Sequence, residues 1–482
     1  MDLEPQSAAP GRVEQNGTNS IPLVERHGSP RDLFTVWAGS NVTYLYFVLG
    51  GLLVLFGLNV WQAIAVVIAG NLFFVGVGFL AITGPRSGVP SEVIGRAFFG
   101  VRGNRVLNLV CGWFVGVLYE AINLSVGATV GFALVLWFAP QAPIWVQGAL
   151  VLGLALLTFT ISVYGHATIL RFSRWITWVL LIGIALMAFF VLLRADFSYE
   201  PAGGSLEGAP LWAVALAGFT LIASAPLSWQ VGADYARYLP PDSNPSHVAF
   251  WTGFGGFLPA VAIGILGVLA GTVVDMSDPT TGMASILPSW FYPIFLVIVI
   301  VGSVANNSLT AYSTGLALLA AGVRWRRSVT VIFDAVIAVG ITLYALFVSN
   351  FLDSLSGLLE VSLVILAPSM AIYVVDIIIR RNRYDGRSLE DESPGGSNWF
   401  RRGWNLAGLT ALVVGAVATA LFVSTTFYMG PLAAALGGAD LSPIVGSLVA
   451  GGLYALLAGR RIRASLASPR TDAEPRSAEV AA

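Results

Sequence analysis

Tyr119, Glu120 and Asn123 stand together in an apolar stretch, and their side chains are suited to binding chemistry. Tyr119 and Asn123 are four residues apart and would share one face of a helix. An aromatic ring can stack on a planar heterocycle, and a side-chain amide can both donate and accept hydrogen bonds at its edge. Glu120 lies three residues before Asn123. A carboxyl group in such a segment indicates either an ion-linked function or a protonated or paired residue that ties helices together.

A second polar stripe runs through residues 303–314. Asn306 and Asn307 are too polar to face lipid, so they must line a cavity or bond to another helix. Spacings of three, four and seven put most of the stripe on one helix face. It contains Ser303, Asn306, Asn307, Ser308, Thr310, Ser313 and Thr314. Glu360 adds another carboxyl group in a later apolar run.

The elements that must position these groups are membrane-spanning helices. Of the 482 residues, 56% are hydrophobic and only 11% are charged, which is too little polar surface for a soluble domain. Apolar runs of about 20 residues, long enough to cross the hydrocarbon core, recur along the chain. We predict an all-α integral membrane protein with twelve spans, at residues 33–57, 61–83, 106–137, 144–164, 174–194, 210–232, 249–274, 289–320, 329–349, 357–379, 404–427 and 441–459.

The arginines set the orientation of these spans. All 25 basic residues are arginines, and only Arg194 falls outside when the N-terminus is placed inside. This distribution follows the positive-inside rule, so both termini are expected in the cytoplasm of a protein that spans the cell membrane. We expect the polar tails, residues 1–32 and 460–482, to be disordered, and residues 380–403 to form a charged cytoplasmic loop.

Composition also excludes several classes of function. The net charge of −1 gives no indication of nucleic-acid binding. The single cysteine, Cys111, excludes an intrachain disulfide and a cysteine-based metal site. An enzyme would need a nucleophile or a metal cluster near one leaflet, and a channel would need repeated pore-lining rings. The sequence carries neither pattern.

Two of the predicted spans contain residues that interrupt a helix. The first span contains Gly39-Ser40-Asn41, and the sixth contains Pro226, which removes a backbone donor and clashes with the preceding turn. The two spans are equivalent if the chain has two five-helix repeats, residues 33–200 and 201–379, followed by two helices in 404–459. Paired broken helices are typical of binding sites in secondary transporters, and ordinary packed kinks are the alternative.

Five segments, in this order, resemble the nucleobase:cation symporter family of purine and cytosine permeases. They lie at residues 32–50, 84–103, 119–128, 228–240 and 305–316, and the resemblance covers about residues 32–385. The second begins Gly84-Pro85-Arg86-Ser87-Gly88-Val89-Pro90, and the fourth contains Ala233-Asp234-Tyr235-Ala236-Arg237-Tyr238.

The resemblance implies ten core helices in two inverted repeats with helices one and six broken, plus two further helices. It also implies alternating access and a base stacked between aromatic side chains of spans three and six. Amides of spans three and eight would hold the edge of the base. On this chain the substrate-binding positions are Tyr119, Asn123, Trp229, Asn306 and Asn307.

The coupling ion is H+ or Na+, and no other cofactor and no metal is expected. Where relatives use sodium, the resemblance implies an ion held at the first break and by hydroxyl groups of span eight. Here those positions are Ala38, Asn41, Asn307 and Ser308. A proton carried by Glu120 is the alternative, because Asn307 replaces a hydroxyl.

The predicted function is cation-coupled uptake of a nucleobase, cytosine or a purine, or of a related planar heterocycle. A symporter of the same fold for another small solute, such as an amino acid, allantoin, a hydantoin or a vitamin, is the alternative. The paired aromatics Tyr119 and Trp229 argue against an amino acid, which would need exposed amides for its carboxylate.

Overall fold

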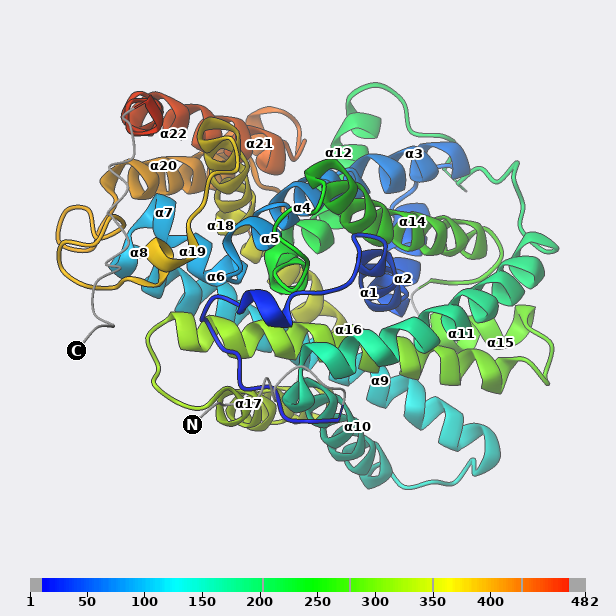
Figure 1. Ribbon diagram of the computed structural model, residues 1–482. Helices are drawn as coiled ribbons and strands as arrows, with labels where there is room; N and C mark the ends of the chain where they lie inside the picture. Colours follow the sequence, from blue (N-terminus) through cyan, green and yellow to red (C-terminus); the bar gives the residue numbers. More distant parts are fainter. Residues whose placement is uncertain (1–10, 202, 277–278, 349–350, 426–427, 468–482) are drawn as a thin grey trace, which may run out of the picture.

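The computed structural model describes residues 11–201, 203–276, 279–348, 351–425 and 428–467, without the side chains of residues 279 and 351–361. Glu360 is therefore outside the described side chains. In the described residues, loops and two isolated β-bridges, Arg401–Trp404 and Ser424–Met429, join helices that pack as one bundle (Figure 1). The expected all-α membrane architecture is confirmed.

Ten helical segments in the described residues are long and apolar enough to cross a bilayer. They are Val60–Ser87 (α3–α5), Val101–Phe138 (α8, η2 and α9), Trp145–Tyr164 (α10), His166–Leu192 (α11), Gly208–Ala236 (α12 and α13), Pro245–Gly271 (α14), Tyr292–Ala320 (α16), Arg327–Phe347 (α17), Ser362–Arg380 (the end of α18, Phe351–Arg380) and Ser442–Ala467 (α22).

Two further segments correspond to the remaining predicted spans. The bent pair α1 (Asp32–Asn41) and α2 (Tyr44–Leu55) passes the same test when taken together. The apolar helix α20 (Leu406–Phe422) has 17 residues, about 26 Å of helix, which is near the minimum for crossing the hydrocarbon core. The count of twelve therefore depends on α20. Shorter helices lie in the connections: η1 (Leu23–Glu25), α6 (Ser91–Ile94), α7 (Arg96–Phe99), α15 (Pro279–Ile286), α19 (Gly386–Glu390) and α21 (Pro431–Ala435).

The first span is broken where the sequence predicted it. Helix α1 ends at Asn41, and α2 starts at Tyr44 at an angle of 55° to it. The Asn41 amide donates to the carbonyl of Trp37 (2.8 Å), and the hydroxyl of Tyr46 donates to the Asn41 side-chain oxygen (2.8 Å). Because Asn41 bonds to both halves, its side chain holds the break in one geometry.

The sixth span is also broken, but three residues later than Pro226. Helix α12 (Gly208–Ser228) continues through Pro226, and α13 (Gly232–Ala236) begins after Trp229-Gln230-Val231. Pro226 lies inside the helix and does not end it. The interruption falls at Gln230, whose side-chain amide donates to the carbonyl groups of Leu227 (3.2 Å) and of Leu366 in α18 (2.7 Å). The interruption thus places Trp229 and Gln230 in irregular backbone.

The third span contains a wide turn that the sequence did not predict. Between α8 (Val101–Leu107) and α9 (Val115–Phe138), the segment η2 (Asn108–Phe114) is a π-helix. Such insertions in α-helices occur often at functional sites. Here the turn lies directly before the stretch that carries Tyr119 and Asn123.

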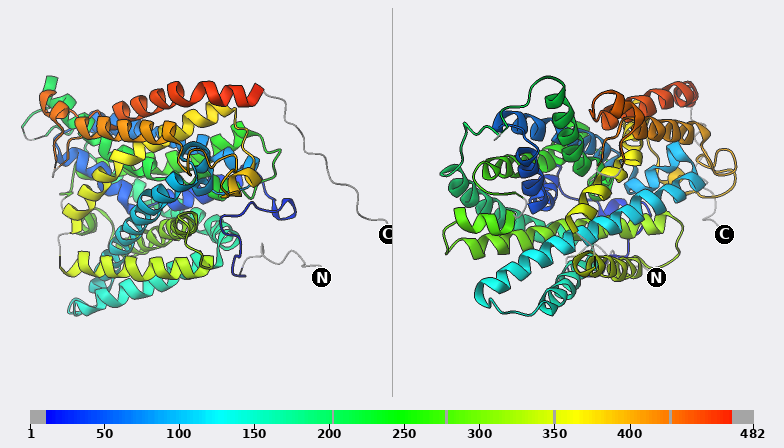
Figure 2. Two further views of the ribbon diagram at one scale, coloured as in Figure 1. Left: turned by 90° about the vertical axis from the view of Figure 1, so that its left-hand side faces the viewer. Right: turned by 180° about the vertical axis from the view of Figure 1, so that it is seen from behind.

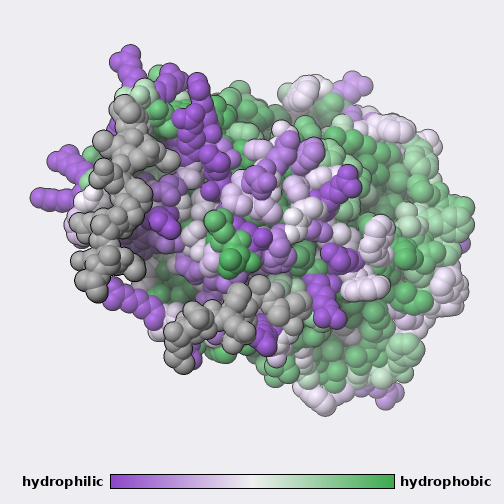
Figure 3. Space-filling view, viewed as in Figure 1, coloured by the Kyte–Doolittle hydropathy of each residue, from purple (hydrophilic) through white to green (hydrophobic). Residues whose placement is uncertain are grey.

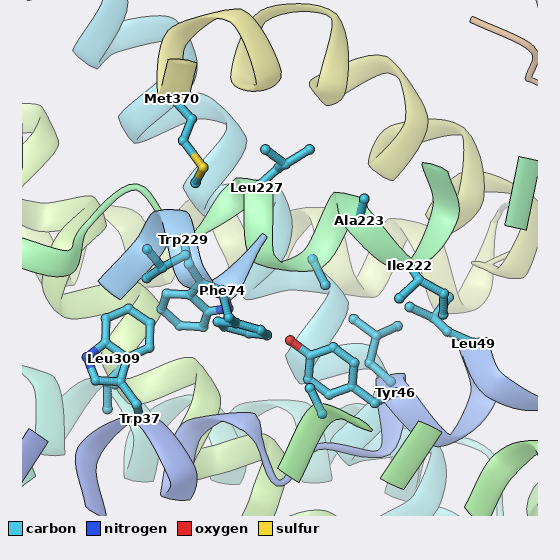
Figure 4. Packing of buried hydrophobic residues seen from close by; sticks show 14 of the residues in the cluster. Trp37, Tyr46, Leu49, Phe74, Ile222, Ala223, Leu227, Trp229, Leu309 and Met370 are labelled. Carbon is cyan, nitrogen blue, oxygen red and sulfur yellow. The ribbon is translucent and has the colours of Figure 1, made fainter. Parts of the chain in front are cut away.

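The two broken helices are held at the centre of the bundle by close packing. Gly50 of α2 faces α14 so closely that an added Cβ would lie 2.0 Å from the carbonyl oxygen of Gly264. Any larger residue there would push the two helices apart. Around the breaks, buried side chains of α1, α2, α4 (Phe74–Ala81), α12, α16 and α18 interdigitate (Figure 4).

Both ends of the described chain lie at the same end of the bundle (Figure 2), which we call the termini face. Hydrophilic residues gather there, and hydrophobic side chains cover much of the rim (Figure 3). Residues 11–31 differ from the disordered tail that we expected, because they cross this face with Glu14 and Ile21 only 5% and 1% exposed. Helix α22 likewise continues to Ala467, beyond the predicted end at residue 459.

Candidate functional site

A cavity of about 150 Å³ lies beside the two breaks. Four of the predicted substrate-binding residues line it: Tyr119, Asn123, Trp229 and Asn306. They come from α9, the interruption of the sixth span, and α16, which the fold brings together from distant parts of the sequence. The cavity continues past the start of the third span to α6, toward the termini face.

The aromatic side of the cavity is rigidly held. The ring of Trp37, which is fully buried in α1, meets the ring of Trp229 edge-on, with centroids 5.4 Å apart and planes at 76° (Figure 4). Trp37 also meets Tyr235 of α13 edge-on at 5.8 Å. Edge-to-face contacts of this kind fix ring orientation. Trp229 therefore presents a defined surface to the cavity, and Tyr119 lines the same space from α9.

The polar side of the cavity is a chain of hydrogen bonds across three helices. The Asn123 amide donates to the side-chain oxygen of Asn306 (2.7 Å). The Asn306 amide donates in turn to the backbone carbonyl of Ser40, next to the break in the first span (2.7 Å). Asn306 is thus largely committed to the protein. The side-chain oxygen of Asn123 is left for a ligand, and the hydroxyl of Tyr119 lies in the same cavity near the hydroxyl of Ser228.

The candidate sodium ligands differ in their hydrogen bonds. The Ala38 carbonyl accepts from Val42 N (3.1 Å), and the Ser308 hydroxyl donates to Val304 O (2.7 Å). Asn41 bonds within the first span, as described above. Both side-chain atoms of Asn307 are buried without a hydrogen-bond partner among the described residues, and Asn307 does not line the cavity. The link between α16 and α1 is made by Asn306 instead.

Glu120 faces away from the cavity. It is fully buried, and neither of its carboxylate oxygens has a hydrogen-bond partner in the described structure. Asp334 of α17 is its electrostatic neighbour. Asp334 is also fully buried, and one of its oxygens accepts from Trp113 Nε1 (2.6 Å). Two buried carboxyl groups thus lie behind the wall that carries Tyr119 and Asn123, where a pair of charges would be costly.

Gln230 and Glu92 are among the polar groups of the cavity lining that sequence reasoning missed. Gln230 follows Trp229 directly and enters the cavity because the helix is interrupted there, although we placed the break earlier. Glu92 belongs to a loop that looks like a connection, and only its contact with the sixth span brings it to the cavity. The position of Gln230 beside Trp229 was a signal in the sequence. No feature of the sequence pointed to Glu92 as a cavity residue.

A bundle of membrane-spanning helices, two of them broken beside a cavity of aromatic and amide side chains, is the architecture of a secondary transporter. The chain belongs to the family described as permeases for cytosine/purines, uracil, thiamine and allantoin, whose sequence model matches residues 20–446. The resemblance noted from the five segments is therefore confirmed, and the family consists of permeases.

Curated relatives match along most of the chain. The putative purine-cytosine permease YxlA of Bacillus subtilis (strain 168) is 29% identical over 476 residues, which cover 94% of this chain and 97% of the relative. The purine-cytosine permease FCY2 of Saccharomyces cerevisiae (strain ATCC 204508 / S288c) is 24% identical over 459 residues, with 88% and 81% covered.

Solved structures show the same fold. Mhp1, a nucleobase-cation-symport-1 family transporter, superimposes in a closed conformation with bromovinylhydantoin bound at a TM-score of 0.73 and 18% identity, over 96% of both chains. Its inward-facing conformation gives a TM-score of 0.69, also at 18% identity, over 95% of both chains. At this identity the likeness concerns the arrangement of the helices.

Proposed function

We propose that this protein is a cation-coupled symporter that takes up a nucleobase, or a related planar heterocycle, by alternating access. The observation that carries the proposal is the cavity at the two breaks. It combines the fixed ring of Trp229, the ring of Tyr119 and the free side-chain oxygen of Asn123. Relatives named as purine-cytosine permeases support the same substrate class.

Tyr119 and Trp229 would enclose the ring, and Asn123 would read its edge. Asn306 would act through Asn123, because its amide bridges Asn123 to Ser40 and so joins α9 to the broken first span. A ligand that bonds to Asn123 would therefore be linked to the position of α1. Movement of a broken helix on ligand binding is the kind of change that alternating access requires.

The termini face would be the cytoplasmic side of the cell membrane. The arginine distribution supports this orientation, since nearly all basic residues lie at the ends of spans that share a side with both termini. The cavity, which continues toward α6, would then lead to the cytoplasm. Substrate would enter from the opposite side in another conformation.

For the coupling ion we favour the proton over sodium. Asn307 stands at a position where the resemblance implies a hydroxyl ligand for sodium. Glu120 has no hydrogen-bond partner among the described residues and stands next to both Tyr119 and Asp334. A neutral carboxyl group is much cheaper than a charged one in such surroundings, which suits a group that gains and loses a proton.

The test is uptake into proteoliposomes of labelled cytosine, adenine, guanine, uracil, hydantoins and pyridoxine, with sodium and pH gradients imposed separately. Pyridoxine is included because a vitamin B6 transporter of Saccharomyces cerevisiae is 26% identical over 379 residues. We expect accumulation of a nucleobase driven by a pH gradient. Accumulation of none of these compounds would reject the proposed function. Accumulation of pyridoxine or a hydantoin alone would exclude a nucleobase as the substrate.

A further inference from the structure

A second pair of buried carboxyl groups lies at the end of the cavity nearest the termini face. Glu92 belongs to α6, and Asp234 belongs to α13, beyond the break in the sixth span. Their side chains are 7% and 0% exposed. Neither residue takes part in the proposed recognition of the base, and both are separate from the Glu120–Asp334 pair behind α9.

Asp234 is fully engaged with the protein. One carboxylate oxygen accepts from the backbone N–H of Ser91 (2.9 Å), and the other accepts from the hydroxyl of Ser313 (2.7 Å). In return the Ser91 hydroxyl accepts from the backbone N–H of Ala233 (3.1 Å). These bonds clamp α6 onto α13 and fix the position of Asp234.

Glu92 has a fixed backbone, and one of its two carboxyl oxygens has no partner in the described residues. Its carbonyl oxygen accepts from the amides of Asn104 (2.7 Å) and Asn108 (3.0 Å). Its side chain lines the cavity, and the Oε2 atom has no hydrogen-bond partner within the described residues. An unpaired oxygen atom of a carboxylate at this burial is expensive, whereas a carboxylic acid can donate its proton to a neighbouring carboxylate.

The charges around Glu92 favour such a shared proton. The titratable or charged groups that face it are Asp234, Tyr235 and Arg237 from the sixth span and Tyr373 from α18. Burial, and then the charge of Asp234, raise the pKa of Glu92 well above its usual value, while Arg237 acts weakly in the opposite direction. Arg237 is mainly occupied elsewhere, with Gly17 O (2.7 Å) and the hydroxyl of Tyr312 (2.9 Å).

We propose that Glu92 and Asp234 hold one proton between them and form the site from which the transporter releases protons to the cytoplasm. When the inner cavity is closed, the O–H group of protonated Glu92 donates a hydrogen bond to the Asp234 carboxylate. When the cavity fills with water, the O–H bond of Glu92 breaks, the proton passes to a water molecule, and the carboxylate is hydrated. This inference rests on the proposed transport function but does not depend on which base is carried.

The first test is a direct observation of the proton. Difference infrared spectroscopy of the purified protein in lipid nanodiscs follows the C=O stretch that only a protonated carboxyl group gives. We expect the wild type to retain a protonated carboxyl group above the pH at which ordinary carboxyl groups ionise. One component of this signal should be lost in Glu92→Gln, beside any component from Glu120, and the signal should be unchanged in Asp242→Asn, which removes an exposed carboxyl group from the same face. An unchanged signal in Glu92→Gln would overturn the assignment.

The second test concerns transport. Exchange of labelled substrate is measured in proteoliposomes of known orientation while the pH on the termini-face side is varied. The wild-type rate should depend on that pH, Glu92→Gln should flatten the dependence, and Glu92→Asp should restore it with a shifted midpoint. A pH profile in Glu92→Gln that matches the wild type would contradict the proposal. If Glu92→Gln does not fold, the Glu92→Asp profile decides, since a midpoint equal to that of the wild type also contradicts it.

The same preparation separates this inference from the proposed function. Quenching of tryptophan fluorescence reports whether the wild type binds a base near Trp229. A protein that binds no base but shows the Glu92 infrared signal would refute the nucleobase assignment and leave the proton site standing. A protein that binds and transports a base but shows no Glu92 signal would support the nucleobase assignment and refute the proton site.

Discussion

Glu14 and Glu120 are both buried carboxyl groups, yet their surroundings are opposite. Glu14 lies where the N-terminal segment crosses the termini face and is 5% exposed. Its carboxylate accepts hydrogen bonds from two tyrosine hydroxyls and one backbone N–H and lies near two guanidinium groups. The partners are Tyr238, Tyr312 (3.0 Å), His166 N (2.7 Å), Arg237 (3.7 Å) and Arg327 (3.8 Å). We call Glu14 and these five residues the clasp.

The clasp connects several elements of the bundle that are far apart in the sequence. Glu14 joins the end of the sixth span to the starts of α11 and α17 and to α16. Glu120, in contrast, has no hydrogen bond in the described structure and only Asp334 as a charged neighbour. A carboxyl group with all its partners satisfied holds structure together, whereas one without partners is available to exchange a proton.

Burial opposes ionisation of Glu14, but Arg327 and Arg237, followed by the hydrogen bonds of Tyr238 and His166, outweigh it. They hold the pKa of Glu14 below its ordinary value. The clasp is therefore charged at neutral pH. Its strength can be measured separately from any property of the cavity.

The largest effect should come from removing the clasp carboxylate. Glu14→Ala leaves two buried guanidinium groups without their counter-charge, which typically costs about 3–5 kcal/mol. We expect a loss of that order in the free energy of unfolding, measured by denaturant titration in detergent. Asp242→Asn, exposed at the same end of the bundle, should lose almost nothing. Equal stability of Glu14→Ala and Asp242→Asn would mean that the N-terminal segment does not bind as described.

In the cavity, removing a side chain that contacts the substrate should affect binding more than folding. Asn123→Ala removes the group that we expect to read the edge of the base, and a lost hydrogen bond to a buried group costs about 1–3 kcal/mol, or roughly 5- to 150-fold in affinity. The check is isothermal titration with the preferred base and with analogues altered at one edge position. Unchanged affinity and selectivity in a folded Asn123→Ala protein would remove Asn123 from the recognition site.

Acid should abolish the contribution of the clasp. Because the folded-state pKa of Glu14 lies below the unfolded value of about 4.5, its stabilisation is complete above that value and is lost as the pH falls through the folded-state pKa. The difference in unfolding free energy between the wild type and Glu14→Ala should therefore be constant from about pH 7 to pH 5.5 and shrink in more acidic solution. A difference that grows on acidification would contradict the assigned sign.

Neutralising Glu120 should have the smallest effect on stability. Glu120→Gln removes a carboxyl group that has no hydrogen bond to lose in the described structure, so we expect a change within about 1 kcal/mol, or a gain. Denaturant titration beside Glu14→Ala gives the comparison directly. A loss as large as that of Glu14→Ala would show that Glu120 is a structural residue that ties helices together.

Part of the fold and of the candidate site can be predicted from the sequence. Hydropathy located the helices, and helix periodicity placed Tyr119 and Asn123 on one face, where they line the cavity together. The Gly39-Ser40-Asn41 segment identified the first break because small and polar residues weaken a helix locally. Pro226 lies three residues before the interruption of the sixth span, since a proline can stay within a helix when the packing around it compensates.

The clasp and Glu92 could not be predicted in this way. Glu14 lies in a polar segment whose composition resembles disorder, and its order depends on partners more than 150 residues away. Periodicity and composition contain no information on such long-range contacts. Glu120 illustrates the same limit: the sequence showed that a carboxyl group is buried, but only the fold shows that it faces Asp334 and not the cavity.

The most direct test of the account compares accumulation and exchange in proteoliposomes that contain Glu120→Gln. If Glu120 carries the coupling proton, accumulation driven by a pH gradient should vanish while exchange of labelled base at equal concentrations survives. Asp242→Asn should accumulate the base like the wild type. Accumulation that persists in Glu120→Gln and follows an imposed sodium gradient would contradict the account and return the coupling site to the region between spans one and eight.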